Sequence, residues 1–250
     1  MFTVAHLSDT HFGNRPEAGP RAAAVLDHLL AMEPRPDVLV VTGDVADHGL
    51  EAEYVEARAA FARWEGPLIV GTGNHDVRPT FAEVLLGRTG EAPLDRALTV
   101  GGFRFLMLDS LVPAPAGQRI DHGVLEPSTL AWLDSELAAS DLPTFVGLHH
   151  APVLVGISLM DSIQLRDPEL LEEVLARHPH VVAVLVGHSH TACATTFAGR
   201  PMLVGGGVVS TVSLDAEPLP PVWVDAPPSF ALHVVDAMGR LTTHWRALPD

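Results

Sequence analysis

The sequence predicts an α/β fold in which mixed β-sheets are covered by helices. Over most of the chain, short apolar runs alternate with stretches that carry apolar side chains at helical spacing. The short runs lack a regular polar alternation, which is typical of strands that are buried on both faces. The last third of the chain contains closely spaced strands joined by turns, which adds antiparallel pairs to the sheets.

Five predicted strands end in a polar cluster that contains Asp, Asn or His. These strands are Phe2–Leu7, Asp37–Val41, Pro67–Val70, Thr144–Leu148 and Val181–Val186. In open α/β folds the carboxyl ends of parallel strands meet at one edge of the sheet, where binding sites form. We therefore expect the five polar clusters to converge on a single site.

Four stretches between these strands are predicted to be helices. They are Arg21–Met32, Glu51–Trp64, Pro127–Leu137 and Asp167–Ala176. Prolines end the first helix, a Gly-Pro pair ends the second, and a proline begins the third. A further strand over residues 103–108 ends at Asp109, which is either a residue at the edge of the site or a turn cap.

The last third of the chain predicts antiparallel strands around one long segment. The strands are Ala192–Phe197, Pro201–Val204, Phe230–Val235 and Leu241–Trp245. Residues 205–229 are rich in Gly and Pro, and we expect a long ordered loop near the mouth of the site that serves as a cap or a dimer element. No linker divides the chain, so residues 1–250 are expected to form a single domain.

The composition argues against several classes of partner. Acidic residues outnumber basic residues by 31 to 15 among the 250 residues, which gives a formal net charge of −16. Such a surface repels nucleic-acid phosphates and anionic lipids, so we expect no nucleic-acid polymer and no membrane as a partner. If the substrate is an anion, something other than Lys and Arg must attract it, and the 14 histidines are the candidates.

Cysteine usage and hydropathy indicate a cytoplasmic protein. The single cysteine, Cys193, excludes an internal disulfide and a thiolate metal cage. The start of the chain has neither a basic region nor a cleavable apolar stretch. The longest apolar run, residues 181–187, is far shorter than the roughly 20 residues that span a bilayer.

The polar clusters contain seven side chains that are suited to metal binding. They are Asp9, His11, Asp44, Asn74, His149, His188 and His190. In two pairs of these ligands, a single residue separates the two members. In an extended chain, both members of such a pair point to the same side. Glycines precede Asp44, Asn74 and His188, which lets the backbone turn sharply and approach a bound ion.

The chemistry of this donor set predicts two neighbouring divalent ions. Seven donors are too many for one tetrahedral ion, and carboxylate, imidazole and amide groups without sulfur favour Mn, Fe or Zn in a site that is open to water. Asp44 is the natural shared ligand. Two such ions lower the pKa of a bridging water, so that hydroxide is available as a nucleophile near neutral pH.

In order along the chain, these residues resemble the motifs of the calcineurin-like metallophosphoesterases. The motifs are Asp9-x-His11, Gly43-Asp44, Gly73-Asn74-His75-Asp76, His149-x-x-Pro152 and Gly187-His188-x-His190, and the resemblance covers residues 3 to about 204. The class III cyclic-nucleotide phosphodiesterase and glycerophosphodiesterase branch is the most similar. The resemblance implies a four-layer α-β-β-α sandwich, in which two mixed sheets are flanked by helices and a dimetal site lies at the carboxyl ends of the strands.

The resemblance also implies a role for each residue. Asp9, His11, Asp44 and His190 would hold one metal, and Asp44, Asn74, His149 and His188 would hold the other. Asn74 and His75 would bind the substrate, and His75 would be catalytic by stabilising or protonating the leaving oxygen. Asp47 and Asp76 would order the loops. Ala151 replaces a proline that is common in the branch, which leaves either His149 or His150 as the ligand; we favour His149.

The predicted function is hydrolysis of a small phosphodiester, with a 3′,5′-cyclic nucleotide such as cAMP favoured. A glycerophosphodiester or a phosphomonoester is the enzymatic alternative. A non-catalytic interaction module on the same fold is the alternative outside enzymes, and the complete set of ligands argues against it. Relatives in the family often self-associate, so the resemblance also implies a homodimer, for which the apolar residues around Trp223 offer a contact.

Overall fold

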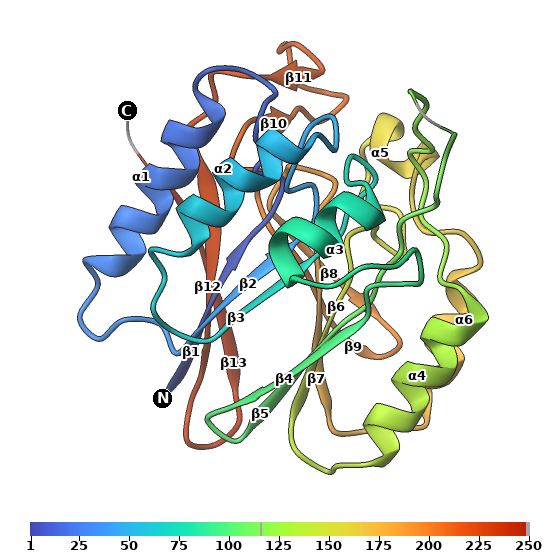
Figure 1. Cartoon of the computed structure of the whole chain (residues 1–250). Helices are drawn as coiled ribbons and strands as arrows, with labels where there is room; N and C mark the ends of the chain where they lie inside the picture. Colours follow the sequence, from blue (N-terminus) through green and yellow to red (C-terminus); the bar gives the residue numbers. More distant parts are fainter. Residues whose placement is uncertain (116, 249–250) are drawn as a thin grey trace.

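Two large β-sheets pack face to face, and helices cover the outer face of each sheet (Figure 1). The computed structural model describes residues 1–115 and 117–248. The order of layers is helix, sheet, sheet, helix, which confirms the four-layer arrangement that the family resemblance implies.

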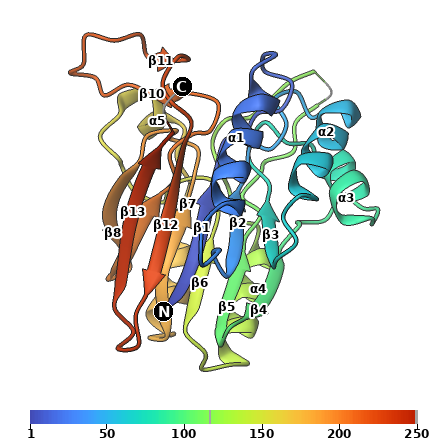
Figure 2. The same ribbon diagram turned by 90° about the vertical axis from the view of Figure 1, so that its left-hand side faces the viewer.

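The first sheet has the strand order β13-β12-β1-β2-β3 (Figure 2). Its parallel part consists of β1 (Phe2–Leu7), β2 (Val38–Thr42) and β3 (Leu68–Gly71). The strands β12 (Ser229–Val235) and β13 (Leu241–Ala247) add an antiparallel hairpin beside β1. Because β1, β2 and β3 run in the same direction, their carboxyl ends lie at one end of the sandwich.

The second sheet has the strand order β4-β5-β6-β7-β9-β8. Its strands are β4 (Arg96–Val100), β5 (Phe103–Met107), β6 (Thr144–Gly147), β7 (Val181–Val186), β8 (Cys193–Phe197) and β9 (Arg200–Val204). The inner strands β5, β6, β7 and β9 are parallel, and β4 and β8 pair antiparallel at the two edges.

Successive strand residues point to opposite layers, which explains why these strands lack polar alternation. In β1, Val4 contacts the core between the sheets, whereas Ala5 and Leu7 contact the helices. The helices α1 (Ala18–Leu30), α2 (Glu51–Phe61) and α3 (Arg78–Leu86) cover the first sheet. The helices α4 (Pro127–Ala138) and α6 (Pro168–Ala176) cover the second. No helix in the described ranges is long and apolar enough to cross a membrane.

The structure adds elements that the sequence pattern does not predict. They are α3, the edge strand β4 and the five-residue helix α5 (Ser158–Ser162). The segment 205–229 is not a continuous loop, because β10 (Thr211–Val212) pairs with β11 (Val222–Trp223). Two-residue strands are too short to show a periodic pattern. The β10–β11 ribbon lies at the end of the sandwich at which β1 ends (Figures 1 and 2).

Candidate metal centre and active site

The seven predicted ligands lie on the loops that follow five strands of the two sheets. Asp9 and His11 follow β1, Asp44 follows β2 and Asn74 follows β3 in the first sheet. The other three, His149, His188 and His190, follow β6 and β7 in the second sheet. The site therefore lies where the carboxyl ends of both sheets meet.

Asp44 lies between histidines from the two sheets. Its Oδ2 atom is 3.4 Å from Nε2 of His11 and 3.3 Å from Nε2 of His149. The Asp44 carboxylate is 2% exposed, so water does not separate these charges from one another. One carboxylate thus contacts two groups of potential metal ligands.

The first group consists of Asp9, His11, Asp44 and His190. One ligand atom from each of the four lies within 4.8 Å of the others. Oδ1 of Asp9 is 3.3 Å from Nε2 of His190, and Nε2 of His11 is 3.2 Å from the same nitrogen. These separations are short enough for a single ion to bind all four.

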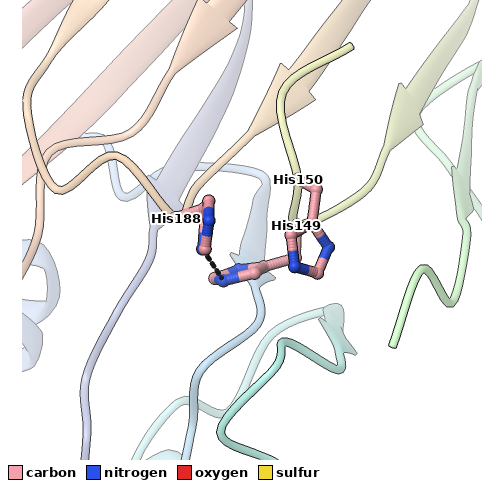
Figure 3. Close-up of side chains that lie close together, drawn as sticks. All are labelled: His149, His150 and His188. Carbon is pink, nitrogen blue, oxygen red and sulfur yellow. Dashed lines mark hydrogen bonds between the residues drawn. The ribbon is translucent and has the colours of Figure 1, made fainter. Parts of the chain in front are cut away.

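The second group surrounds the His149 ring. Its Nε2 atom is 3.1 Å from Oδ1 of Asn74. The same nitrogen is 3.2 Å from Nδ1 of His188 (Figure 3). Asp44 completes this group through the 3.3 Å approach to the same nitrogen. The group therefore offers two imidazole nitrogens, an amide oxygen and a carboxylate oxygen around one point.

Each of the four histidines uses its outward nitrogen in a hydrogen bond that fixes the ring. Nδ1 of His11 donates to Oδ1 of Asp47 at 2.9 Å, and Nδ1 of His149 donates to the Thr42 carbonyl at 2.7 Å. The outward nitrogens of the other two rings lie within bonding distance of the Ile163 carbonyl and of Ser210, respectively. The inward nitrogens are thereby oriented for metal binding, as in many metal sites.

The polar atoms of the centre fit divalent cations. Asp9 is fully buried, and neither of its carboxylate oxygens has a hydrogen-bond partner among the described residues. Burial raises the pKa of Asp9, because a carboxylate without hydrogen bonds is costly to charge in a low dielectric. A cation at this position would satisfy both oxygens and offset that cost.

The charges around His149 in the second group also favour a bound cation. Burial lowers the pKa of His149, but the neighbouring Asp44 and Asp9 carboxylates outweigh it and raise the pKa to about 9. Burial alone would raise the pKa of Asp44, yet the nearby His149 and His75 hold it well below its usual range. The carboxylates thus attract positive charge strongly at the point that a metal would occupy.

His150 has a different environment from His149, although the two rings are adjacent (Figure 3). Nε2 of His150 donates to the Asp121 carbonyl at 3.1 Å, and its Nδ1 lies 2.8 Å from the Ser110 hydroxyl. Both ring nitrogens are therefore engaged in hydrogen bonds. Burial lowers the pKa of His150 well below the usual value, so the ring is neutral.

The backbone of the centre is strained at five of the seven predicted ligands. Asp9, His11, Asp44, His188 and His190 have φ angles between 43° and 65°, in the left-handed region. For a residue other than glycine, this backbone conformation costs on the order of 1–2 kcal/mol. Strain of this kind persists only where the surrounding structure enforces it and is typical of functional sites.

His75 lies beside the two groups and faces the cavity. Its backbone N–H donates to Oδ1 of Asp44 at 2.9 Å, and its Nδ1 donates to the Asp47 carbonyl at 2.9 Å. Nε2 of His75 is 4.0 Å from Oδ2 of Asp44. Burial lowers the pKa of His75, but the Asp44 charge and the Asp47 hydrogen bonds outweigh it and raise the pKa to about 9.

Two further aspartates order the loops of the centre. Asp76 accepts hydrogen bonds from the backbone N–H groups of Val45, Ala46 and Gly73 and from the Tyr54 hydroxyl. It therefore ties the Asp44 loop to the Asn74 loop. Asp47 orients His11 as described above, and its carboxylate also accepts a hydrogen bond from Asn14.

A cavity of about 340 Å³ opens over the two groups. Among the described residues that line it, Arg119 is the one Lys or Arg. Its Nη1 lies 2.8 Å from Nδ1 of His75, and its Nε donates to Oδ1 of Asp121. That same oxygen accepts a hydrogen bond from Nδ2 of Asn74 at 3.3 Å. Arg119 and Asp121 were not predicted from the sequence, because their Pro- and Gly-rich loop has no periodic pattern.

Asp109 is part of a buried clamp rather than of the cavity wall. Its carboxylate accepts hydrogen bonds from Nε of Arg78 and from the hydroxyl of Thr72, both at 2.7 Å. The Arg78 guanidinium also donates to the Leu111 carbonyl and to Glu126. The clamp therefore holds the start of the loop that carries Arg119 against the end of β3.

Comparisons with known proteins agree with this architecture. One relative is a probable cyclic nucleotide phosphodiesterase of Rhodococcus erythropolis, which is 37% identical over 86% of this chain and 73% of that protein. Another is a glycerophosphodiester phosphodiesterase of Enterobacter lignolyticus, which is 30% identical over 92% of this chain and 86% of that protein. A dimetal phosphatase of Danio rerio shares the fold, with a TM-score of 0.75 at 15% identity over 98% of this chain and 96% of that structure. The model of the calcineurin-like phosphoesterase family matches residues 2–192. The chain therefore belongs to the calcineurin-like phosphoesterase family, as the order of its motifs predicts.

Proposed function

We propose that this protein is a phosphodiesterase that uses two divalent metal ions to hydrolyse a small 3′,5′-cyclic nucleotide. The observation that carries the proposal is the position of the Asp44 carboxylate within 3.4 Å of a histidine from each ligand group. Three relatives that are named as cyclic nucleotide phosphodiesterases, or as probable ones, and are 35–37% identical to this chain support the choice of substrate.

The ligand assignment follows the two groups. Asp9, His11, Asp44 and His190 would hold one ion, and Asp44, Asn74, His149 and His188 would hold the other. We assign His149 and not His150, because both nitrogens of His150 are already bonded to Ser110 and Asp121. When bound, two such ions supply positive charge for the phosphate and make hydroxide available near neutral pH.

His75 is the residue that acts on the leaving group in this proposal. Its Nδ1 is held by the Asp47 carbonyl, so the free Nε2 is the atom that faces a substrate in the cavity. Bound ions would offset the Asp44 charge, but the hydrogen bonds from His75 to Asp47 still favour the protonated ring. Nε2–H therefore donates a proton, or a strong hydrogen bond, to the oxygen that leaves phosphorus.

Asn74 and Arg119 hold the substrate phosphate. Asp121 accepts hydrogen bonds from both side chains, so it fixes the Asn74 amide and the Arg119 guanidinium relative to each other. The guanidinium presents a positive charge to the cavity of a protein whose net charge is −16. A phosphate oxygen near Arg119 gains a charge-assisted hydrogen bond.

The proposal is tested with Mn-loaded protein of measured metal content. We expect turnover of 3′,5′-cyclic AMP and of a nitrophenyl phosphodiester, with two ions bound per chain. Cleavage of the nitrophenyl diester without turnover of the cyclic nucleotide would reject the substrate assignment. Faster turnover of a glycerophosphodiester would instead favour the activity for which the Enterobacter lignolyticus relative is named.

A further inference from the structure

A second and larger cavity adjoins the metal centre. Its volume is about 700 Å³, and it shares Asp47, Asn74, His75 and Arg119 with the cavity over the ligand groups. A substrate whose phosphate lies at His75 can therefore extend into this space. The two volumes lie in the range of about 300–1,000 Å³ that is usual for small-molecule sites.

The wall of the larger cavity differs in chemistry from the metal centre. The start of α3 contributes Val77 and Pro79 to this wall, and the loop that follows β5 contributes Leu111, Val112 and Pro113. The side chain of Val77 is 41% exposed, although it adjoins a polar centre. An apolar wall with a few polar groups at its edge is the usual lining of a small-molecule site.

Polar groups occur at the rim of this apolar wall. Gln118 and Glu91 line the cavity, and Arg119 lies at the junction of the two cavities. A glutamine and a glutamate provide donors and acceptors for the edge of a heterocycle. The planar guanidinium of Arg119 can stack on a ring.

We infer that the 700 Å³ cavity binds the base of a nucleotide whose phosphate lies at the metal centre. The inference rests on the proposed function and names the part of the substrate that gives it selectivity. A flat apolar ring with polar edges matches the wall of Val77, Pro79 and Leu111 and the rim of Gln118 and Glu91. A glycerol diester, which is flexible and hydrophilic, would gain little from burial against this wall.

The test compares two ligands that share a ribose and a 5′-phosphate and differ in the base. Adenosine 5′-monophosphate and ribose 5-phosphate are titrated into the Mn-loaded protein by calorimetry. We expect the nucleotide to bind at least about tenfold more tightly, because only it fills the larger cavity. Equal affinities would overturn the inference.

The variant Val77→Ser replaces an apolar side chain of the cavity wall with a small polar one and should keep the fold. Val77 precedes the first turn of α3 with an extended backbone, and serine is favoured at this N-cap position. We expect the ratio of the two affinities to fall by about threefold to tenfold, as for the loss of one buried valine. Val55→Ser is the matched control, because Val55 is also 41% exposed but lies on α2 outside the cavity.

The outcomes separate this inference from the proposed function. A large affinity ratio that falls in Val77→Ser but not in Val55→Ser supports the base site, even if cyclic AMP is not hydrolysed. Hydrolysis of cyclic AMP together with equal affinities leaves the phosphodiesterase proposal intact and overturns the base site. An equal loss of the ratio in both variants also overturns it, because the effect would then not come from the cavity wall.

Discussion

Oδ2 of Asp44 and Nε2 of His149 lie 3.3 Å apart, although the two residues follow strands of different sheets. The contact joins the carboxyl end of β2 to that of β6 across the seam of the sandwich. The same oxygen lies 3.4 Å from His11, so a single atom contacts both ligand groups. Metal binding in one group therefore changes the charge that the other group feels.

Replacing Asp44 tests this shared position. Asp44→Asn keeps the size of the side chain and removes its charge, so we expect both ions to be lost together and activity to fall below detection. The measurement is metal content by elemental analysis after dialysis, alongside the hydrolysis rate. Asp27→Asn, at an exposed site in an ion pair with Arg63, is the control and should bind two ions. Loss of one ion only would contradict the shared role.

His75→Ala separates catalysis from metal binding. The predicted ligands do not include His75, so we expect metal content to be unchanged. Turnover should slow by about 10²–10⁴, which is the usual range for a proton-transfer group. A diester with a nitrophenolate leaving group needs less protonation and should be affected less than cyclic AMP. Loss of metal in this variant would show that His75 is a ligand.

Arg119→Gln tests the positive charge at the mouth of the centre. The guanidinium is partly exposed, so solvent weakens its attraction for a phosphate. We expect KM for a phosphodiester to rise by about tenfold, with a smaller change in kcat. Raising the salt concentration should weaken substrate binding by the wild type more than by the variant. Arg246→Gln, on the exposed edge strand β13, should leave KM unchanged. An unchanged KM in Arg119→Gln would remove Arg119 from the substrate site.

A buried histidine pair predicts loss of stability in acid. His6 and His233 are fully buried, and their ring nitrogens approach to 3.1 Å. Burial lowers the pKa of His6 from 6.5 to about 3, so below pH 6.5 the unfolded chain binds a proton that the folded chain does not. The free energy of unfolding therefore falls as the pH falls through that window.

The measurement is urea unfolding of the Mn-loaded protein at several pH values between 5 and 7. His6→Gln should reduce the pH slope by up to about 1.4 kcal/mol per pH unit relative to the wild type. His244→Gln, exposed on β13, should keep the slope of the wild type. If His6→Gln and the wild type lose stability in parallel, His6 is not the group that titrates on unfolding.

The layers of the fold follow from the sequence because the central strands of both sheets are buried on both faces. The runs that form β2 and β7 are apolar almost throughout, and the segments between the strands carry a clear helical spacing. The helix α3 was not predicted, since its apolar residues do not form a clear stripe. The edge strand β4 is half exposed, so it lacks the apolar run that marks the buried strands.

The residues of the candidate metal centre could be identified from the sequence because they directly follow predicted strands. The polar cluster after each strand marks Asp9, Asp44 and Asn74 without knowledge of the fold. Arg119 and Asp121 have no such marker, since they reach the centre through the loop that the Arg78–Asp109 clamp fixes. Contacts of this kind depend on tertiary packing and not on local pattern.

The left-handed backbone at the strand ends has a consequence for the robustness of the fold. Glycine adopts such angles without penalty, whereas His190 has a φ of 53° and carries a full side chain. The variant His190→Gly would lose a nitrogen donor, but its backbone would be relaxed. Without added ions, it should therefore withstand heat better than the wild type. Residues kept for their donor atoms thus lower the heat tolerance that the scaffold has without ions.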